Sequence, residues 1–515
     1  MKLEREKNSI RNSVWGILNR LIVILGPFVI RTLIIYLLGT EYLGLSSLFT
    51  SILQILSMAE LGLGSAIAFC MYKPIAEDNT ELICQILSLF RKTYKLIGIV
   101  VFGVGMLLMP FLHLFIKNDV PTDINIYILY ILYLLNTSVS YFLFAYKNVL
   151  FSAFQREDIL SKTYSALLIA QFGLQAVILI VSKNYYFYYT IVLIVSICNN
   201  LIINFLSKKY YPQYCPRGSV PENIVKDIKE KVAGTVISKF CGLTRNTFDS
   251  IIISSFLGLT TVAIYGNYYY ILSNIASVLV ILVTSMKAGI GNSVALDSLE
   301  KNYHDYNKFT FMYSLIASWC AICLLCLYQP FMELWVGEKN MFPFSVVVLL
   351  CIYFMWQTMG DITNAYSGAA GLWWENRYRT IFEAISNLIL NICLGYFWGV
   401  FGIVLATVLT LFFFNFIWQT KILFDNYFKD YQASDYIYTY IKHILVTMFV
   451  GAVCYFICQR VKLGLFMNLL IRGIICVIVP GVLFYMIYRK NVFWREAKDM
   501  VFNLIKKSLR RRVNT

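Results

Sequence analysis

Residues 14–38 read VWGILNRLIVILGPFVIRTLIIYLL, an apolar run that only two charged side chains interrupt, Arg20 and Arg31. A helix needs about 20 apolar residues to cross the hydrocarbon core of a bilayer, so this stretch is long enough to span one. It is too long for the core of a signal peptide, and no small-residue cleavage site follows it. We therefore expect a first transmembrane helix that the chain retains.

The same pattern recurs along the whole chain of 515 residues, of which 59% are hydrophobic and 14% are charged. An ordinary soluble domain carries about 25% charged residues, and the mean hydropathy here is +0.67. This composition excludes a soluble globular protein, a disordered chain and a secreted disulfide scaffold. It predicts an all-α polytopic membrane protein. The fourteen expected transmembrane helices are residues 14–38, 43–71, 95–116, 124–146, 163–182, 186–206, 232–257, 261–286, 309–334, 344–370, 381–399, 402–420, 437–457 and 467–488.

The formal net charge is +16, and Lys and Arg are concentrated in every second segment between the apolar stretches. Cytoplasmic loops of membrane proteins carry such an excess, so the basic charge needs no nucleic acid as a partner. The alternation predicts that both termini are cytoplasmic. The predicted outer segments are short, and their Lys and Arg residues are Lys117, Lys183, Lys339, Arg460 and Lys462.

A short internal repeat predicts how the helices are grouped. Residues 62–68, GLGSAIA, resemble residues 289–295, GIGNSVA, near the cytoplasmic ends of the second and eighth predicted spans. We therefore expect two pseudo-symmetric six-helix lobes followed by two extra helices. The predicted divisions are an N-terminal lobe at 1–210, a basic cytoplasmic linker at 211–231, a C-terminal lobe at 232–424, two additional helices at 425–488 and a basic tail at 489–515. The tail fits either a membrane-surface helix or a simple topology anchor.

Four cations within predicted spans are candidates for a transport pathway. Arg20 and Arg31 are 11 residues apart, about three helical turns, so they share one face of the first span. Lys239 and Arg245 lie in the seventh span. Ionisable groups inside the bilayer cost about 3 kcal/mol each on insertion scales, so they mark transport pathways by default. A cavity with several cations suits an anionic guest, and the planar fork of Arg matches phosphate.

Each of these charges also has a purely structural explanation. Arg20, Arg31 and Lys239 could extend their heads to the membrane surface. Arg245 could be neutralised by Asp249, which follows it by four residues. Glu60 and Asp361 could balance charge, carry a coupling proton or form structural pairs.

Several other features point away from an enzyme. Cys320, Cys323 and Cys326 form a CxxCxxC run, but no fourth Cys or His is near in sequence, so we expect free thiols and no metal site. The tyrosines in residues 265–270, YGNYYY, fit either an interfacial belt or a surface that stacks on sugar rings. The chain has no phosphate-binding GxxxxGK[ST] loop, no Asp-x-Asp pair and no HExxH sequence. We expect a protein without a cofactor.

Several stretches resemble a known family. They are residues 30–49, IRTLIIYLLGTEYLGLSSLF, residues 60–67, ELGLGSAI, residues 258–265, GLTTVAIY, residues 334–338, LWVGE, and residues 371–377, GLWWENR. These stretches resemble the oligosaccharide-lipid flippases of bacterial capsule, exopolysaccharide and O-antigen pathways. Those flippases are a branch of the multidrug/oligosaccharidyl-lipid/polysaccharide exporter superfamily.

The resemblance implies a protein of the bacterial cytoplasmic membrane that moves polyprenyl-pyrophosphate-linked repeat units from the inner to the outer leaflet by alternating access. It implies a cationic substrate cavity, for which Arg20, Arg31, Lys239 and Arg245 are the candidates. Glu60, Asp249 and Asp361 are then candidates for charge balance or ion coupling. The implied partners are the lipid-linked glycan, membrane lipids, and a polymerase with other polysaccharide-assembly proteins.

Three other functions compete with this interpretation. A cation-coupled drug exporter of the same superfamily would need an acidic site, whereas the intramembrane excess here is positive. A membrane-embedded enzyme would need larger outer loops than this chain has. A scaffold without transport activity would not explain Arg31 and Arg245.

Overall fold

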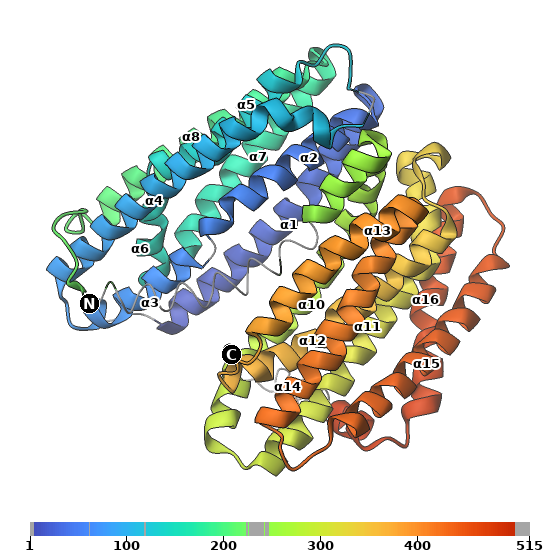
Figure 1. The fold of residues 1–515 in the computed structure, drawn as a ribbon. Helices are drawn as coiled ribbons and strands as arrows, with labels where there is room; N and C mark the ends of the chain where they lie inside the picture. Colours follow the sequence, from blue (N-terminus) through green and yellow to red (C-terminus); the bar gives the residue numbers. More distant parts are fainter. Residues whose placement is uncertain are drawn as a thin grey trace, which may run out of the picture. The chain divides into compact units, whose positions relative to one another are not determined.

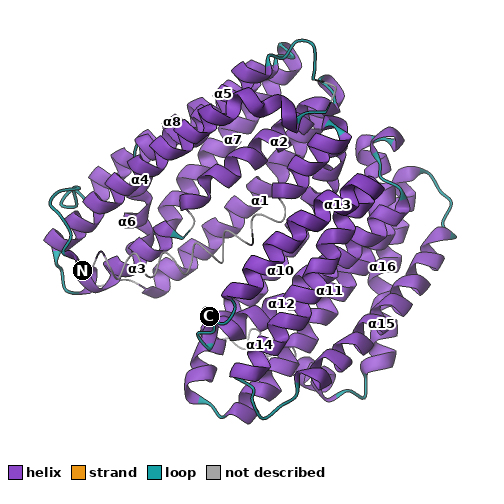
Figure 2. Cartoon of the chain, in the orientation of Figure 1, coloured by secondary structure: helices purple, strands orange, loops and turns teal. Residues whose placement is uncertain are grey.

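The computed structural model describes residues 5–60, 62–117, 120–222, 225, 242 and 247–499. Throughout these residues the regular structure is helical, and no strand occurs among them (Figure 2). The all-α fold class is therefore confirmed. The chain divides into two compact units, Met1–Gly266 (unit 1) and Asn267–Thr515 (unit 2). The division falls within helix α10, Leu259–Leu296, and the predicted lobe boundaries stay predictions.

Within the described residues, ten helices are long and apolar enough to cross a membrane, or eleven if one bent pair counts as a span. This confirms a multi-pass membrane protein, while the count of fourteen stays a prediction. Two predicted spans, 381–399 and 402–420, fall inside one continuous helical stretch, Arg377–Asn426. Gly399 breaks that stretch with a φ of 58°, a conformation that glycine adopts without steric cost. The predicted span 232–257 lies mostly outside the described residues, apart from the helix Thr247–Leu257.

Unit 1 consists of antiparallel helices joined by short connections (Figure 1). The predicted second span, 43–71, is two helices that a 3-10 turn at Ser57–Glu60 separates. Asn125 and Asn184 each cap a helix, because each side chain accepts hydrogen bonds from two backbone N–H groups of the first turn. The helices are α1 (Arg5–Leu37), α2 (Thr40–Leu56), α3 (Leu63–Ala76), α4 (Thr80–Leu108), α5 (Ile126–Phe142), α6 (Asn148–Ala153), α7 (Glu157–Val181) and α8 (Tyr185–Tyr210).

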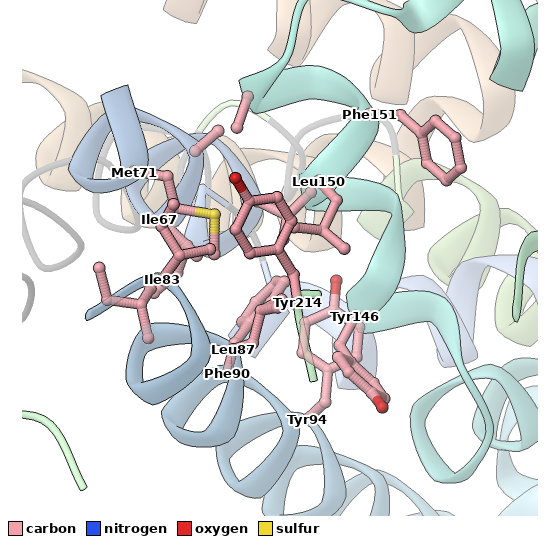
Figure 3. Packing of buried hydrophobic residues seen from close by; sticks show 14 of the residues in the cluster. Ile67, Met71, Ile83, Leu87, Phe90, Tyr94, Tyr146, Leu150, Phe151 and Tyr214 are labelled. Atoms are coloured by element: carbon pink, nitrogen blue, oxygen red, sulfur yellow. The ribbon is translucent and has the colours of Figure 1, made fainter. Parts of the chain in front are cut away.

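One buried cluster joins α3, α4 and α6 in unit 1. Figure 3 shows Met71 and Ile83 facing Leu150, with Phe90 and Tyr94 on the adjoining turns. All five are at least 94% buried. Because lipid tails are as apolar as these side chains, close packing rather than the exclusion of water holds such helices together in a bilayer.

An ion cluster joins the starts of α1 and α7. The carboxylate of Asp158 is fully buried and pairs with Arg11 at 2.7 Å, Arg156 at 3.0 Å and Lys162 at 3.4 Å. The side chain of Asn12 also accepts a hydrogen bond from the backbone N–H of Asp158. These three cations lie in segments that the distribution of Lys and Arg predicts to be cytoplasmic. They also hold α1 against α7 through their contacts with Asp158.

Unit 2 is built around α11, which packs against α12, α15 and α16. The start of the C-terminal tail also docks on α11, because Glu496 lies 3.0 Å from His304 and 3.8 Å from Lys308. Residues 500–515 of the predicted tail lie outside the described residues. The helices are α10, α11 (Leu299–Val336), α12 (Phe344–Ala369), α13 (Arg377–Thr410), a π-helical stretch (Leu411–Trp418), α14 (Gln419–Asn426), α15 (Ala433–Gln459) and α16 (Leu465–Tyr488).

Candidate functional site

Two of the four candidate cavity cations lie in described residues, and both are on α1. Arg20 and Arg31 are half-buried, and their 11-residue separation corresponds to about 16 Å along the helix axis. Lys239 and Arg245 lie outside the described residues. The structure therefore locates Arg20 and Arg31, while the positions of Lys239 and Arg245 stay predictions.

Arg31 lies against α10 and α2. A Cβ atom added at Gly266 of α10 would lie 3.0 Å from Nη2 of Arg31 and 3.3 Å from Oγ of Ser47 in α2. The positive charge of Arg31 also acts on the hydroxyls of Tyr185 and Tyr188 in α8. The guanidinium is therefore surrounded by other helices of unit 1, and a side chain at position 266 would crowd it.

A group of tyrosines, which we call the tyrosine cluster (Tyr133, Tyr185, Tyr188 and Tyr189), lies beside Arg31. The hydroxyls of Tyr133 and Tyr185 are 3.0 Å apart and hydrogen-bonded, and Tyr185 also donates to the carbonyl of Tyr42 at 3.3 Å. The rings of Tyr133 and Tyr189 stack with centroids 3.6 Å apart. The sequence analysis did not single out these residues, although the run YYFYY at 185–189 was a visible signal.

Asp249 is almost fully buried, with 1% of its surface exposed. Its carboxylate accepts a hydrogen bond from the hydroxyl of Tyr265 at 2.9 Å. Its predicted partner Arg245 lies outside the described residues, so that pairing stays a prediction. Tyr265 and Tyr268 are both buried, and Tyr268 donates to Gln329 at 2.8 Å. Neither an interfacial belt nor a sugar-stacking surface describes these two tyrosines, because internal hydrogen bonds hold them in the protein interior.

The other two predicted acids each have a tyrosine partner. Glu60, in the turn between α2 and α3, accepts a hydrogen bond from Tyr94 of α4 at 2.5 Å. Asp361 of α12 accepts one from Tyr313 of α11 at 2.5 Å. The charge of Lys287 on α10 also acts on Asp361. Both carboxylates are half-buried and hydrogen-bonded, an arrangement that can hold either a negative charge or a bound proton.

One buried ion pair was missed by the sequence analysis. Arg379 and Glu383 on α13 are 5% and 6% exposed, and Nη1 of Arg379 lies 3.0 Å from Oε2 of Glu383. Nε of Arg379 also donates to Asn376 at 3.0 Å. Arg379 falls between the predicted spans 344–370 and 381–399, whereas the structure places it in the first turn of α13. The four-residue spacing of Arg379 and Glu383 was the signal that could have revealed the pair.

Unit 2 contains an apolar groove of about 420 Å³ between α11, α12 and α15. Its surface is almost wholly apolar, and Thr447 and Tyr455 are the hydroxyl-bearing residues in its lining. A groove of this chemistry can hold a hydrocarbon chain, because it offers dispersion contacts and few polar partners. The main lining residues are Leu325, Ile352, Met355, Trp356, Met448 and Phe456.

A model of the polysaccharide biosynthesis protein family matches residues 9–286. The chain belongs to this family. The match includes three of the five stretches on which the resemblance rests, at 30–49, 60–67 and 258–265, and it confirms that resemblance. A search of curated proteins found no match.

Several solved structures share the fold of this family member. The lipid II flippase MurJ in its inward closed conformation aligns with a TM-score of 0.69 at 15% identity, covering 93% of this chain and 99% of MurJ. An inward-facing multidrug resistance transporter of the MATE family and MOP superfamily aligns with a TM-score of 0.58 at 17% identity, covering 77% of this chain and 94% of the transporter. A point mutant of the Vibrio cholerae MATE transporter VcmN aligns with a TM-score of 0.56 at 12% identity, covering 83% of this chain and 98% of VcmN.

At these identities the likeness establishes the fold alone. The fold is that of MurJ-like and MATE-like transporters, and the family is one of polysaccharide biosynthesis.

Proposed function

We propose that this protein is a flippase that moves polyprenyl-pyrophosphate-linked oligosaccharide units from the inner to the outer leaflet of the bacterial cytoplasmic membrane. The supporting observation is Arg31, whose guanidinium lies among helices of unit 1 within a span whose one other charged side chain is Arg20. Charged groups inside a bilayer are costly, so a cation in such a place marks a candidate substrate pathway. A pyrophosphate head is the anionic guest that would use it, because Arg binds phosphate oxygens through two parallel hydrogen bonds.

In this proposal Arg20, Lys239 and Arg245 complete the set of cations that lower the cost of carrying the head group across the membrane. Their charges replace part of the hydration that the pyrophosphate loses. A membrane potential that is negative inside contributes about 2.3 kcal/mol per charge per 100 mV to outward movement of an anion. The same field would return the emptied cationic protein, so the potential favours both halves of the cycle.

The apolar groove of unit 2, considered by itself, has a lining that suits a lipid tail, because Met355, Trp356 and Phe456 offer dispersion contacts to a hydrocarbon chain. Glu60, Asp249 and Asp361 would balance the cations in the empty state or take up a coupling ion. Both termini would be cytoplasmic, in line with the distribution of Lys and Arg.

The test uses the purified full-length protein in liposomes that contain a fluorescent polyprenyl-pyrophosphate oligosaccharide on the inner leaflet. We expect the sugar to become accessible to an added lectin, faster when a potassium diffusion potential drives anions outward. The variant Arg31→Ala plus Arg245→Ala should lose this activity by at least about tenfold, since one charge-assisted hydrogen bond contributes about 1.5–3 kcal/mol.

The matched control is Arg460→Ala plus Lys462→Ala, which removes two exposed cations of a predicted outer loop. It should transport at the wild-type rate. Equal rates for wild type and the Arg31/Arg245 variant would remove the arginines from the mechanism but keep the flippase. Failure of the wild type to move the lipid, together with uptake of an organic cation under a proton gradient, would replace the flippase by a cation-coupled exporter.

A further inference from the structure

Four cysteines from three helices come together in unit 2. They are Cys326 of α11, Cys454 and Cys458 of α15, and Cys476 of α16, and we call them the four-thiol cluster. Their Sγ atoms all lie within 4.8 Å of one another. Each of the four side chains is at most 1% exposed.

The dimensions of the four-thiol cluster match one metal ion. Zinc–sulfur bonds of about 2.3 Å in a tetrahedron place neighbouring sulfurs about 3.8 Å apart. Thiols within 4.8 Å of one another therefore need displacements of about 1 Å or less to reach that geometry. Four sulfur ligands in a tetrahedron are typical of zinc or iron. We propose that the four-thiol cluster binds a single tetrahedral divalent ion of the zinc class.

The surrounding residues hold the cluster in place. The indole N–H of Trp319 on α11 donates to the backbone carbonyl of Cys476 at 2.8 Å, which fixes the position of α16 beside α11. The thiol of Cys323 donates to the same carbonyl at 4.0 Å. Arg472 lies one turn before Cys476, and its charge acts on Cys458. A cation at this place offsets part of the negative charge of four metal-bound thiolates.

The ion would link α11 to α15 and α16, two consecutive helices that follow it about 100 or more residues later in the chain. α11 packs against both α15 and α16, and these two helices pack against each other (Figure 1). The groove between α11, α12 and α15 lies next to the four-thiol cluster. Ile322 belongs to the groove lining and also packs in the buried hydrophobic cluster that contains the four cysteines. A metal at this point would therefore hold α15 in position as one wall of the groove.

The sequence analysis expected no metal because no fourth ligand follows Cys320, Cys323 and Cys326. Of these three only Cys326 belongs to the four-thiol cluster, and its three partners lie 128 or more residues further along the chain. Cys454 and Cys458 are four residues apart on α15, so both face the same side of that helix. This i, i+4 pair was the visible signal of the site.

The experiment measures metal in the full-length protein purified in detergent without chelators. We expect about one zinc or iron ion per chain by mass spectrometry of the elements, and loss of the ion in Cys454→Ser plus Cys476→Ser. The matched control is Cys351→Ser plus Cys393→Ser, which removes one buried and one exposed thiol outside the cluster and should keep the ion.

A second measurement covers the case in which the cluster variant does not fold. Metal-free wild type is titrated with Co²⁺, and a tetrahedral tetrathiolate site gives intense sulfur-to-cobalt absorption that saturates at about one ion per chain. A membrane-permeant chelator should lower the thermal unfolding midpoint of the metal-loaded protein. Wild type that carries no metal and gives no such Co²⁺ spectrum would overturn the proposal. So would intact masses showing that the four thiols form disulfide bridges.

Discussion

The interior of unit 1 around Arg31 and the interior of unit 2 around Cys454 are built from different chemistry. Arg31 lies among hydroxyl groups of the tyrosine cluster and Ser47, with the buried carboxylate of Asp249 elsewhere in the same unit. Cys454 lies among three other thiols and apolar side chains such as Ile322 and Val450. Both interiors are packed, but charged groups line the first, whereas thiols line the second and Arg472 is the charge that acts on them.

The difference follows from the cost of burial. A charged side chain in hydrocarbon costs several kcal/mol and persists where its charge is used or paired. A thiol packs as a small apolar group and adds little cost until a metal or an oxidant reacts with it. In the two proposals above, the interior of unit 1 handles an anion and the thiol interior holds helices together. Four experiments test this contrast.

Arg31→Gln should have the largest effect, because it keeps most of the side-chain length and removes the charge. We expect transport to fall by about 10- to 100-fold, the equivalent of one charge-assisted hydrogen bond. Arg31→Lys, which keeps the charge but not the planar fork, should fall between Gln and wild type. The initial rate in the liposome assay measures both variants, and a Gln variant as fast as wild type would break the contrast between the units.

Tyr265→Phe should lower the stability of unit 1 by about 1–3 kcal/mol, because it removes a hydrogen bond to the buried carboxylate of Asp249. Thermal unfolding of the detergent-solubilised protein measures the loss. The control is Tyr438→Phe, which changes an exposed tyrosine on α15 and should leave the midpoint unchanged. Equal midpoints for both variants would show that Asp249 is stabilised by other groups.

Tyr94→Phe and Tyr313→Phe test the feature that the two units share. Each variant removes a tyrosine hydroxyl that donates to a half-buried carboxylate. The acceptor is Glu60 in unit 1 and Asp361 in unit 2. We expect similar losses of about 1 kcal/mol in each, smaller than for a fully buried acid. A much larger effect of one variant on transport than of the other would identify the acid that acts in coupling.

Lys162→Ala should have the smallest effect, below about 1 kcal/mol, because Lys162 is partly exposed and two arginines still pair with Asp158. Thermal unfolding at low and high salt measures it. Arg11→Ala is the informative companion, because Arg11 joins α1 to α7 at 2.7 Å from Asp158. If Lys162→Ala destabilised the protein as much as Arg11→Ala, the ion cluster would depend on total charge rather than on the link between helices.

Some features of the fold and the site were predicted from the sequence, and others were missed. The span at 14–38, the all-α class and the family resemblance were correct, because hydropathy and short sequence signatures are local properties. The positions of Arg20 and Arg31 on one helix followed from helical periodicity. The pairing of Arg379 with Glu383 was equally local but was missed, because Arg379 was assigned to a loop.

Composition and short motifs are enough to establish that this protein spans a membrane many times, belongs to the polysaccharide biosynthesis family and carries cations within apolar segments. The contacts between side chains of different helices became visible in the folded structure. It placed Gly266 and Ser47 against Arg31, gave Glu60 and Asp361 their tyrosine partners, and gathered four cysteines from three helices. Insertion of a segment into the bilayer depends on its own apolar composition, whereas contacts between helices depend on packing between residues far apart in the chain.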